Sequence, residues 1–543
     1  ILAEIGSSGF DADGDDLRLI YKVHRRIRIM DANGSDAATV LVPLFRSEKE
    51  HEELLNVKGI SYNLENGAIV ETKLDSKSVF TEKQDDEIML RKFTLPAVKP
   101  GTVIEYTYTV ASPYYQHLRS WDFQGKYPRL WSEYSVALPE FFDYMLIPQG
   151  YEKFDVNTKS VSRTTFAFHS EPFGGTGHTN TVMVTPNVTT FKWAMKDVAP
   201  IRAENYITTL DNYVKRVEFQ LAAYNWPGEK PKPVRTTWGE LMKDVIKSAA
   251  FGEPLEKYNG FLQEKVDELV KGAQTDREKA MNIYTWVRDN YTCSKENTMW
   301  LRKSIREIYT AKNGSVADIN MLLVAMLRKA GISTYPLLLS TRDNGYVFQD
   351  YPLYTHFNYV IAGAYLNDGF VTLDASQPLL GFGKLPAACY NGIAREVSEL
   401  ATPVVLAADS LKEQKFTSVM LTKLENGAMA GTFQQRPTYL ESYNIRRQVR
   451  AESADGYFKK VTKSYTGTLS LEQEDIEDLK KLESPVMVKY NFKMEVGNGD
   501  VLYINPLLGE AYKSNPFKSM ERKFPVEMNA VFDELYSFNM EVP

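Results

Sequence analysis

The sequence predicts a multidomain α+β protein, with a β-sandwich first, a mixed α+β domain in the middle and a second β-sandwich last. Short runs of alternating apolar and polar residues, typical of strands, fill the chain up to about residue 215 and return after about residue 400. Helical periodicity is confined to the stretch between them. The 543 residues correspond to three or four domains at roughly 150 residues each. We expect domains at residues 1–225, 226–395 and 396–543.

The N-terminal part has the features of a β-sandwich. Apolar residues alternate with polar ones over residues 17–29 and 102–110, and Asn-Gly turn dipeptides at 33–34 and 66–67 follow such runs. Aromatic residues make up 12% of the chain, which favours pleated, half-buried surfaces. Many short strands separated by turns indicate two packed sheets.

The central part begins with a proline-rich linker at residues 226–233. A capping box from Thr237 to Glu240 opens a helix, residues 276–288 carry an apolar stripe, and a third helix is predicted over 316–328. Strands follow at 335–340, 357–362 and 370–373. Within the β-rich C-terminal part, residues 475–482 predict a short acidic helix or a turn.

Composition excludes several classes of function. The net charge is -6 without a long basic run, which argues against nucleic acid as a partner. Two cysteines cannot build a disulfide framework or a zinc site, and His169 and His178 lack a third ligand, so we expect no metal and no cofactor. No apolar run is long enough to span a membrane. Residue 1 is Ile, from which we expect that a preceding signal peptide was removed.

Residues 314–332 resemble the nucleophile helix of the transglutaminase-like, papain-type superfamily. In that family a glycine is followed, two residues on, by the catalytic cysteine at a helix N-terminus, then by an aspartate and a leucine-rich helix. Gly314, Asp318 and the Arg-x-x-Gly-Ile ending at 328–332 match this pattern, whereas the cysteine position holds Val316. A nucleophilic thiol needs the helix N-terminus and a neighbouring histidine to lower its pKa, and valine has no titratable group.

The other two triad positions follow from the same resemblance. Residues 357–361 are similar to the family's Phe-Asn-His-Val-Ile strand, and residues 373–376 to its Leu-Asp-x-Thr/Ser ending. The histidine position holds Tyr359, and Asp374 is kept at the family spacing, since 374 − 359 = 15. The resemblance therefore implies Val316, Tyr359 and Asp374 as triad-equivalent positions. We expect Tyr359 to hydrogen-bond to Asp374 while Val316 fills the space of the thiol.

Four neighbours and two cysteines offer alternatives. Ser315 and Asp318 lie beside the nucleophile position, and His356 and Asn358 beside the base position. Ser315 is better explained as a helix cap, and His356 points to the opposite strand face from residue 359. Cys293 and Cys389, neither of which is predicted at a helix N-terminus, are better explained as small buried residues than as relocated nucleophiles.

The flanks resemble a bacterial family in which a β domain of unknown function precedes the transglutaminase-like core and a second β domain follows. The stretches that carry this resemblance are residues 93–108, 503–506 and 515–526. Members include proteins described as cysteine proteases, and the resemblance implies a periplasmic or cell-surface location.

We therefore expect a pseudoenzyme that binds an unknown peptide, protein or glycan, or serves as a scaffold. An active peptidase, amidase or acyltransferase with a non-standard nucleophile is the first alternative. A glycan- or peptide-binding surface protein that uses exposed aromatics is the second, with Trp121, Trp131 and Trp193 as candidates.

Overall fold

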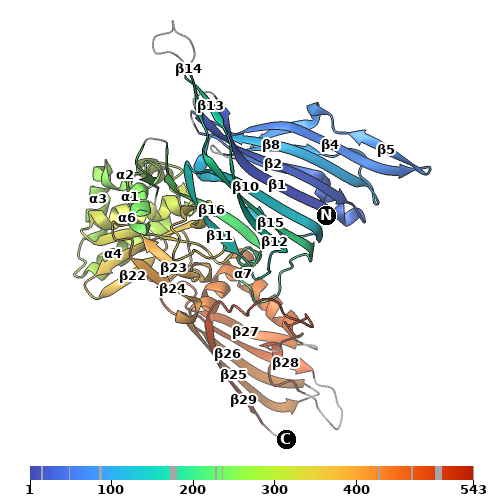
Figure 1. The fold of residues 1–543 in the computed structure, drawn as a ribbon. Coiled ribbons are helices and arrows are strands. Elements are labelled where there is room, and N and C mark those ends of the chain that lie inside the picture. The colour runs from blue at the N-terminus through green and yellow to red at the C-terminus, as the bar shows by residue number, and fades with distance from the viewer. Residues whose placement is uncertain are drawn as a thin grey trace. The chain divides into compact units, whose positions relative to one another are not determined.

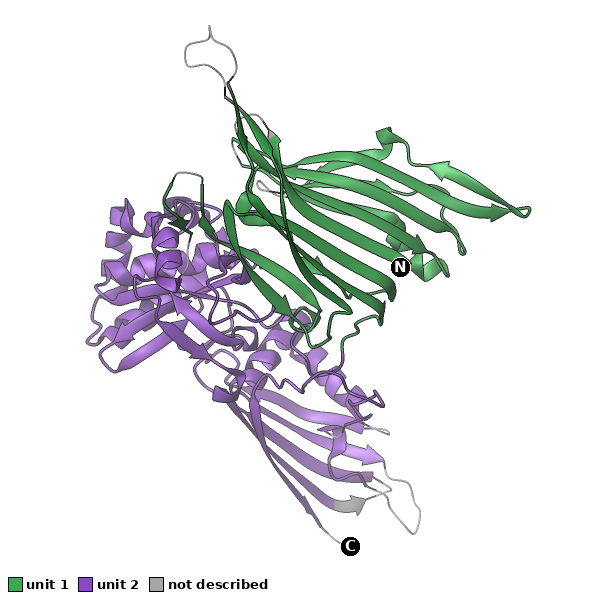
Figure 2. Ribbon diagram, in the orientation of Figure 1, with its two compact units in different colours: residues 1–203, 210–236 green, residues 204–209, 237–543 purple. Residues whose placement is uncertain are grey.

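The computed structural model describes residues 1–541 except 14–15, 48, 85–87, 171–179, 227–228, 235–236, 426–427, 466–468, 496–503 and 511. It divides into two compact units, residues 1–203 with 210–236, and residues 204–209 with 237–543 (Figure 2). The three domain boundaries expected from the sequence stay predictions. His178, the 174–177 glycine loop and part of the 226–233 linker lie outside the described residues.

The first unit is built around one eight-stranded sheet. Its strands are antiparallel except for the β1–β10 pair, which is parallel. In spatial order they are β12 (Val156–Arg163), β15 (Asn187–Val198), β10 (Arg129–Pro139), β1 (Ala3–Asp13), β2 (Asp16–Arg28), β8 (Val103–Ser112), β4 (Glu53–Glu65) and β5 (Ala68–Lys73).

Three smaller sheets complete this unit. They are β11 (Phe142–Gln149), β16 (Arg216–Tyr224) and β17 (Lys232–Pro233) with β9 (Trp121–Asp122); β3 (Thr39–Phe45), β7 (Ile88–Thr94) and β6 (Val79–Lys83); and β13 (Phe166–Ser170) with β14 (Asn180–Val184).

The alternation predicted for residues 17–29 is confirmed, because buried positions alternate with partly or fully exposed ones along most of β2. The buried side chains of the eight-stranded sheet join those of β3, β7, β11 and β16 in one hydrophobic cluster. Trp121 and Trp193 belong to this cluster and are buried, so they cannot form binding platforms. Trp131 is partly exposed and donates from Nε1 to Glu133, 3.2 Å away.

The second unit opens with the helices of the central domain (Figure 1). These are α1 (Trp238–Lys247), α2 (Glu253–Glu256), α3 (Gln263–Val270), α4 (Asp276–Asn290), α5 (Ile305–Ala311) and α6 (Val316–Lys329). A capping box stands at the start of α1, α4, α5 and α6. For α1 this confirms the capping box of Thr237 and Glu240 that the sequence predicted.

The central sheet has five antiparallel strands, in the order β22 (Gly369–Leu373), β21 (Tyr359–Leu366), β20 (Ser333–Leu339), β23 (Gly392–Glu396) and β24 (Pro403–Leu406). A short parallel pair, β18 (Thr292–Cys293) with β19 (Asn313–Gly314), leads into α6.

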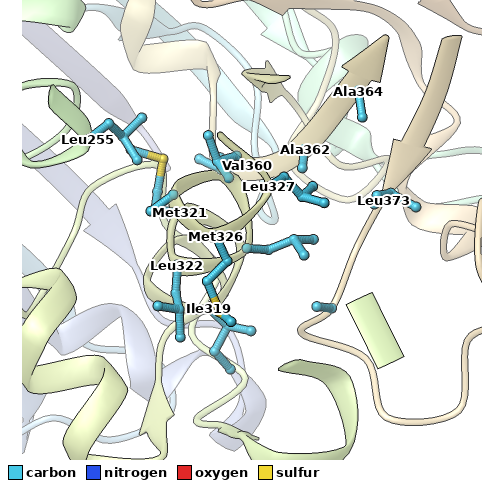
Figure 3. Close-up of a cluster of buried hydrophobic side chains, with 14 of the residues drawn as sticks. Leu255, Ile319, Met321, Leu322, Met326, Leu327, Val360, Ala362, Ala364 and Leu373 are labelled. Carbon is cyan, nitrogen blue, oxygen red and sulfur yellow. The ribbon is translucent and has the colours of Figure 1, made fainter. Parts of the chain in front are cut away.

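Helix α6 is the centre of this domain. Every residue from Val316 to Leu327 is buried, which fits a helix that is apolar on nearly all sides. Figure 3 shows its side chains packed with Val360 and Ala362 of β21 and with Leu373 at the end of β22. This packing fixes the start of α6 next to the start of β21 and the end of β22, where the candidate site lies.

The C-terminal part differs from the predicted second β-sandwich. Its described residues form one five-stranded sheet, in the order β27 (Leu469–Glu477), β28 (Met487–Glu495), β26 (Ala428–Pro437), β25 (Lys412–Glu425) and β29 (Val531–Met540). Helix α7 (Tyr439–Ser464) covers this sheet through Ile445 and Phe458, which share its hydrophobic cluster. Of residues 475–482, predicted as a short acidic helix or a turn, 475–477 continue strand β27 and 478–480 form a turn.

The sequence missed α7 because of a break inside it. Ser453 has a left-handed backbone, with φ 74, so the segment is two helices joined at that residue. The apolar positions before and after the break are out of phase, and no single stripe runs along the segment. A helix therefore occupies the place where the predicted second sheet would lie.

Candidate functional site

The N-terminus of α6 is held by a buried capping box. The Ser315 Oγ accepts the Asp318 N–H at 3.1 Å, and the Asp318 Oδ2 accepts the Ser315 N–H at 2.9 Å. The Asp318 Oδ1 also accepts the backbone N–H of Arg302 at 2.8 Å. A Cβ on Gly314 would lie 2.6 Å from the Asp318 Cβ, so this close approach requires glycine. Ser315 is thus a helix cap, as the sequence indicated.

Val316 is the first residue of α6, and its side chain is 0% exposed. It packs in a small apolar cluster with Leu339, Tyr359 and Cys389. Its N–H donates to the Glu296 carbonyl oxygen at 3.2 Å. The helix N-terminus, where the family places its thiol, therefore holds a closely packed aliphatic side chain.

Tyr359 begins β21 and Asp374 directly follows β22, and the two side chains meet. The Tyr359 hydroxyl donates to the Asp374 Oδ2 at 2.8 Å, which confirms the hydrogen bond expected from the sequence. Burial raises the pKa of Tyr359 well above its ordinary value, and the nearby Asp374 raises it further. The hydroxyl is therefore protonated at neutral pH and is a donor to the carboxylate.

The other oxygen of Asp374 is bonded by two further side chains. The Oδ1 accepts the Asn320 Nδ2 at 2.9 Å, the Ser376 N–H at 3.0 Å and the Ser376 hydroxyl at 2.6 Å. The residue is 0% exposed, and burial raises its pKa although these hydrogen bonds oppose the shift. Asp374 is thus a fully enclosed carboxylate rather than a group open to a ligand.

Asn320 was not predicted and joins three elements. Its Nδ2 donates to the Val360 carbonyl oxygen and to Asp374, both at 2.9 Å, and its Oδ1 accepts the Ala375 N–H at 2.8 Å. It is one helical turn after Val316, so both side chains lie on the same face of α6. A polar residue in the middle of an apolar helix was the signal that could have identified it.

His356 and Asn358 serve the loop before the site. The His356 Nδ1 is 3.0 Å from the Tyr346 carbonyl oxygen, and its ring lies 5.3 Å from that of Phe348. Asn358 accepts the Thr341 N–H at 2.9 Å and donates to the Thr341 Oγ1 at 2.8 Å. Neither residue provides any of the hydrogen bonds described above for Asp374.

Both cysteines adjoin the site. Cys389 is buried in the cluster with Val316 and Tyr359, and Cys293 on β18 is half-buried against the same cluster. Burial raises the pKa of the Cys389 thiol well above its ordinary value, with a smaller contribution from Asp374. Burial also raises the pKa of Cys293, although the Lys295 N–H donates to its sulfur at 3.3 Å. Both thiols are therefore poor sources of thiolate.

Two adjoining cavities, with volumes of about 370 and 740 Å³, open over these residues. They share Asn297, Gln377, residues 386–388 and Asn529, and we call them together the cleft. Tyr359 and Cys389 line the smaller cavity, and Cys293 and Ser376 the larger one.

A chain of hydrogen bonds connects the cleft with the buried carboxylate. The Gln377 Nε2 donates to the Tyr359 hydroxyl at 3.2 Å, and the Tyr443 hydroxyl on α7 donates to the Gln377 Oε1 at 3.4 Å. Through Tyr359 this chain continues to Asp374 and then to Asn320 on α6. Helix α7 is therefore part of the site, which the sequence did not predict.

Two further observations concern metal binding and membrane-spanning helices. Among the described residues, no three His, Cys, Asp or Glu side chains are grouped so that they could hold a metal ion. The helices of the described part include none with the length and apolarity needed to cross a membrane.

Comparisons with known proteins agree with this geometry. Residues 263–375 match the transglutaminase-like superfamily, and residues 15–202 match a domain of unknown function, DUF3857. No curated protein matches the sequence.

Two crystal structures are similar to the chain. A "putative protease" from Parabacteroides distasonis has a TM-score of 0.51 at 12% identity, over 91% of this chain and 93% of that one. A "putative cysteine protease" from Cytophaga hutchinsonii has a TM-score of 0.18 at 12% identity, over 66% of this chain and 77% of that one. The first similarity supports a shared fold only. The family matches, in turn, show that residues 263–375 form a transglutaminase-like domain and that a DUF3857 domain precedes it in the chain.

Proposed function

We propose that this protein is a non-catalytic member of the transglutaminase-like group, whose central domain binds a ligand in the cleft without acyl transfer or hydrolysis. The observation that carries the proposal is Val316 at the N-terminus of α6, buried in the apolar cluster. Acyl transfer on this scaffold requires a thiolate at that place, and an aliphatic side chain can neither attack a carbonyl group nor carry an acyl group.

The base position supports the same proposal. A general base must accept a proton from the nucleophile near neutral pH. Tyr359 instead holds its proton and donates it to Asp374 at 2.8 Å, and burial raises its pKa well above the ordinary value. The aspartate that orients a histidine in the family is here satisfied by a tyrosine, an asparagine and a serine.

The other candidate nucleophiles are also poorly prepared. The Ser315 hydroxyl accepts a helix N–H and is buried. Burial raises the pKa of Cys293 and of Cys389, which lowers the fraction of thiolate at neutral pH. A peptidase or acyltransferase with one of these groups as nucleophile is therefore the weaker alternative.

Activity assays on the full chain test the proposal. We expect neither cleavage of a mixed peptide library nor incorporation of a primary amine into a glutamine-containing protein above the rate of a buffer blank. The matched variants are Cys293→Ser, Cys389→Ser and Ser315→Ala, each of which removes one candidate nucleophile. Turnover by the natural chain that disappears in one of these variants would refute the non-catalytic role.

The setting of this domain also belongs to the proposal. We place the protein in the periplasm or on the cell surface, with residues 1–225 as a β-sandwich, because the flanks resemble exported bacterial proteins and the sheets of the first unit share one core. Fractionation of the native host with an antibody against the full chain tests the location. Recovery in the cytoplasmic fraction would contradict it.

A further inference from the structure

The larger cavity of the cleft carries an unusual set of charges. Lys295, Arg447 and Arg450 line it, and no Asp or Glu is among its described lining residues. All three side chains are exposed. None of them makes an ion pair with a carboxylate of the described part of the chain, although 28 such pairs occur there.

Two of these cations, Arg447 and Arg450, belong to helix α7 and line the cavity. The lining residues of α7 are Leu440, Tyr443, Asn444, Arg447, Arg450 and Ala451. Their spacing of three or four residues places them on one face of the helix. Lys295 comes from the loop after β18, so the positive charges lie on two different walls of the cavity.

The neighbouring residue, Arg446, shows what a structural arginine looks like on the same helix. It is buried and donates to the carbonyl oxygens of Asp478, Leu479, Lys481 and Ser484 at distances of 2.6 to 3.1 Å. Arg447 makes no such hydrogen bonds to carbonyl oxygens of the described residues, and its guanidinium lies 5.6 Å from the centre of the Tyr443 ring. Folding alone therefore does not explain why Arg447 and Arg450 face the cavity.

Cations gathered around one cavity repel one another, and the low-dielectric walls strengthen their field. A bound anion relieves this repulsion. We propose that the cleft binds an acidic peptide whose carboxylates contact Lys295, Arg447 and Arg450, an inference that rests on the proposed binding role of the cleft.

The remaining lining favours a peptide over a sugar. Asn297, Gln377, Asn444 and Asn529 present side-chain amides, which both donate and accept hydrogen bonds and match the main-chain groups of a peptide. No tryptophan is among the described lining residues, and the two tyrosines there, Tyr291 and Tyr443, are buried, so these residues offer a sugar no exposed aromatic ring to stack on. A volume of about 740 Å³ lies within the range of about 300–1,000 Å³ usual for ligand sites.

The test measures binding of a fluorescent hexaglutamate peptide to the full chain by anisotropy, with hexaglutamine as the neutral probe of equal length. We expect saturable binding of hexaglutamate, weakened by added salt, and none of hexaglutamine. The double variant Arg447→Gln/Arg450→Gln should lower the affinity about tenfold, as should Lys295→Gln combined with either change.

The matched control is Lys459→Gln/Lys463→Gln. It removes the same charge from exposed positions of the same helix, at residues that do not line the cleft. We expect less than about a twofold change in affinity for this control. Any of three results would overturn the inference. They are no saturable binding of hexaglutamate, an equal loss of affinity in Arg447→Gln/Arg450→Gln and in the control, and binding of a sulfated oligosaccharide in place of hexaglutamate.

Mass spectrometry of the recovered peptide separates this inference from the proposed function. A cleaved peptide would refute the non-catalytic role, while the affinity measurements would still decide the question of acidic ligands. An intact peptide that does not bind would overturn the inference alone.

Discussion

Replacing Tyr359 with phenylalanine removes one hydroxyl from the centre of the site and keeps the ring that packs against Val316. Among the described residues, the Tyr359 hydroxyl is the only donor to the Asp374 Oδ2. The carboxylate is 0% exposed, so water cannot take the place of the lost donor without a rearrangement. A hydrogen bond to a charged group contributes about 1.5–3 kcal/mol, and we therefore expect the free energy of unfolding of this domain to fall by about 2 kcal/mol near neutral pH.

The effect should depend on pH in a defined direction. Burial raises the pKa of Asp374 above its ordinary value of 3.8. The folded state then binds more protons than the unfolded state between the two pKa values, so stability is greatest below the unfolded pKa and falls as pH rises through the folded pKa. Loss of the Tyr359 donor disfavours the carboxylate and raises the folded pKa of Asp374 further, so the fall in stability should extend to higher pH. Below the pKa of Asp374 the cost should shrink to about 1 kcal/mol, because the lost bond is then one to a neutral group.

Hydrogen–deuterium exchange of α6 and β21 measures this quantity for the central domain, independently of unfolding elsewhere in the chain. The matched control is Tyr258→Phe, since Tyr258 is 89% exposed and the same hydroxyl is lost to solvent. A change for Tyr359→Phe below about 0.5 kcal/mol, or no larger than that of the control, would show that Asp374 does not depend on this donor.

Three further changes test other parts of the site. Gly314→Ala should destabilise the start of α6 by about 1–3 kcal/mol in thermal unfolding, because its Cβ would lie 2.6 Å from that of a buried aspartate, whereas Gly260→Ala meets nothing within 4 Å and should have little effect. Asn320→Leu should cost about 3 kcal/mol by the same measurement, since it removes three hydrogen bonds to buried partners; a loss under about 1 kcal/mol would contradict this. Iodoacetamide should label half-buried Cys293 before buried Cys389, as followed by mass spectrometry, and the reverse order would show that Cys389 is accessible.

Local signals were sufficient for most of the central domain. The helix predicted over 316–328 is α6, Val316–Lys329, and the helix predicted over 276–288 is α4, Asp276–Asn290. Both begin with capping residues close in sequence and continue with a clear apolar pattern. The strand predicted over 370–373 likewise agrees with β22, Gly369–Leu373.

Features that depend on distant contacts could not be predicted in this way. Gln377 has a place in the site because Tyr443, 66 residues later, donates to it. The hydrogen bonds of Asn320 form only when β21 and the residues after β22 are packed against α6, so its role is not visible in the sequence around it. The C-terminal helix was missed because its break at Ser453 destroys the periodicity that would identify it.

The participation of α7 means that the core does not enclose the cleft by itself. The residues that touch Asp374 come from α6, β21 and the turn after β22, whereas Arg447 and Arg450 come from a segment that follows the core in the chain. Exposed positions on one face of a helix accept substitutions with little loss of stability. Changes there can therefore alter what the cleft prefers while the core stays as it is, so related chains can acquire new ligands without refolding their centre.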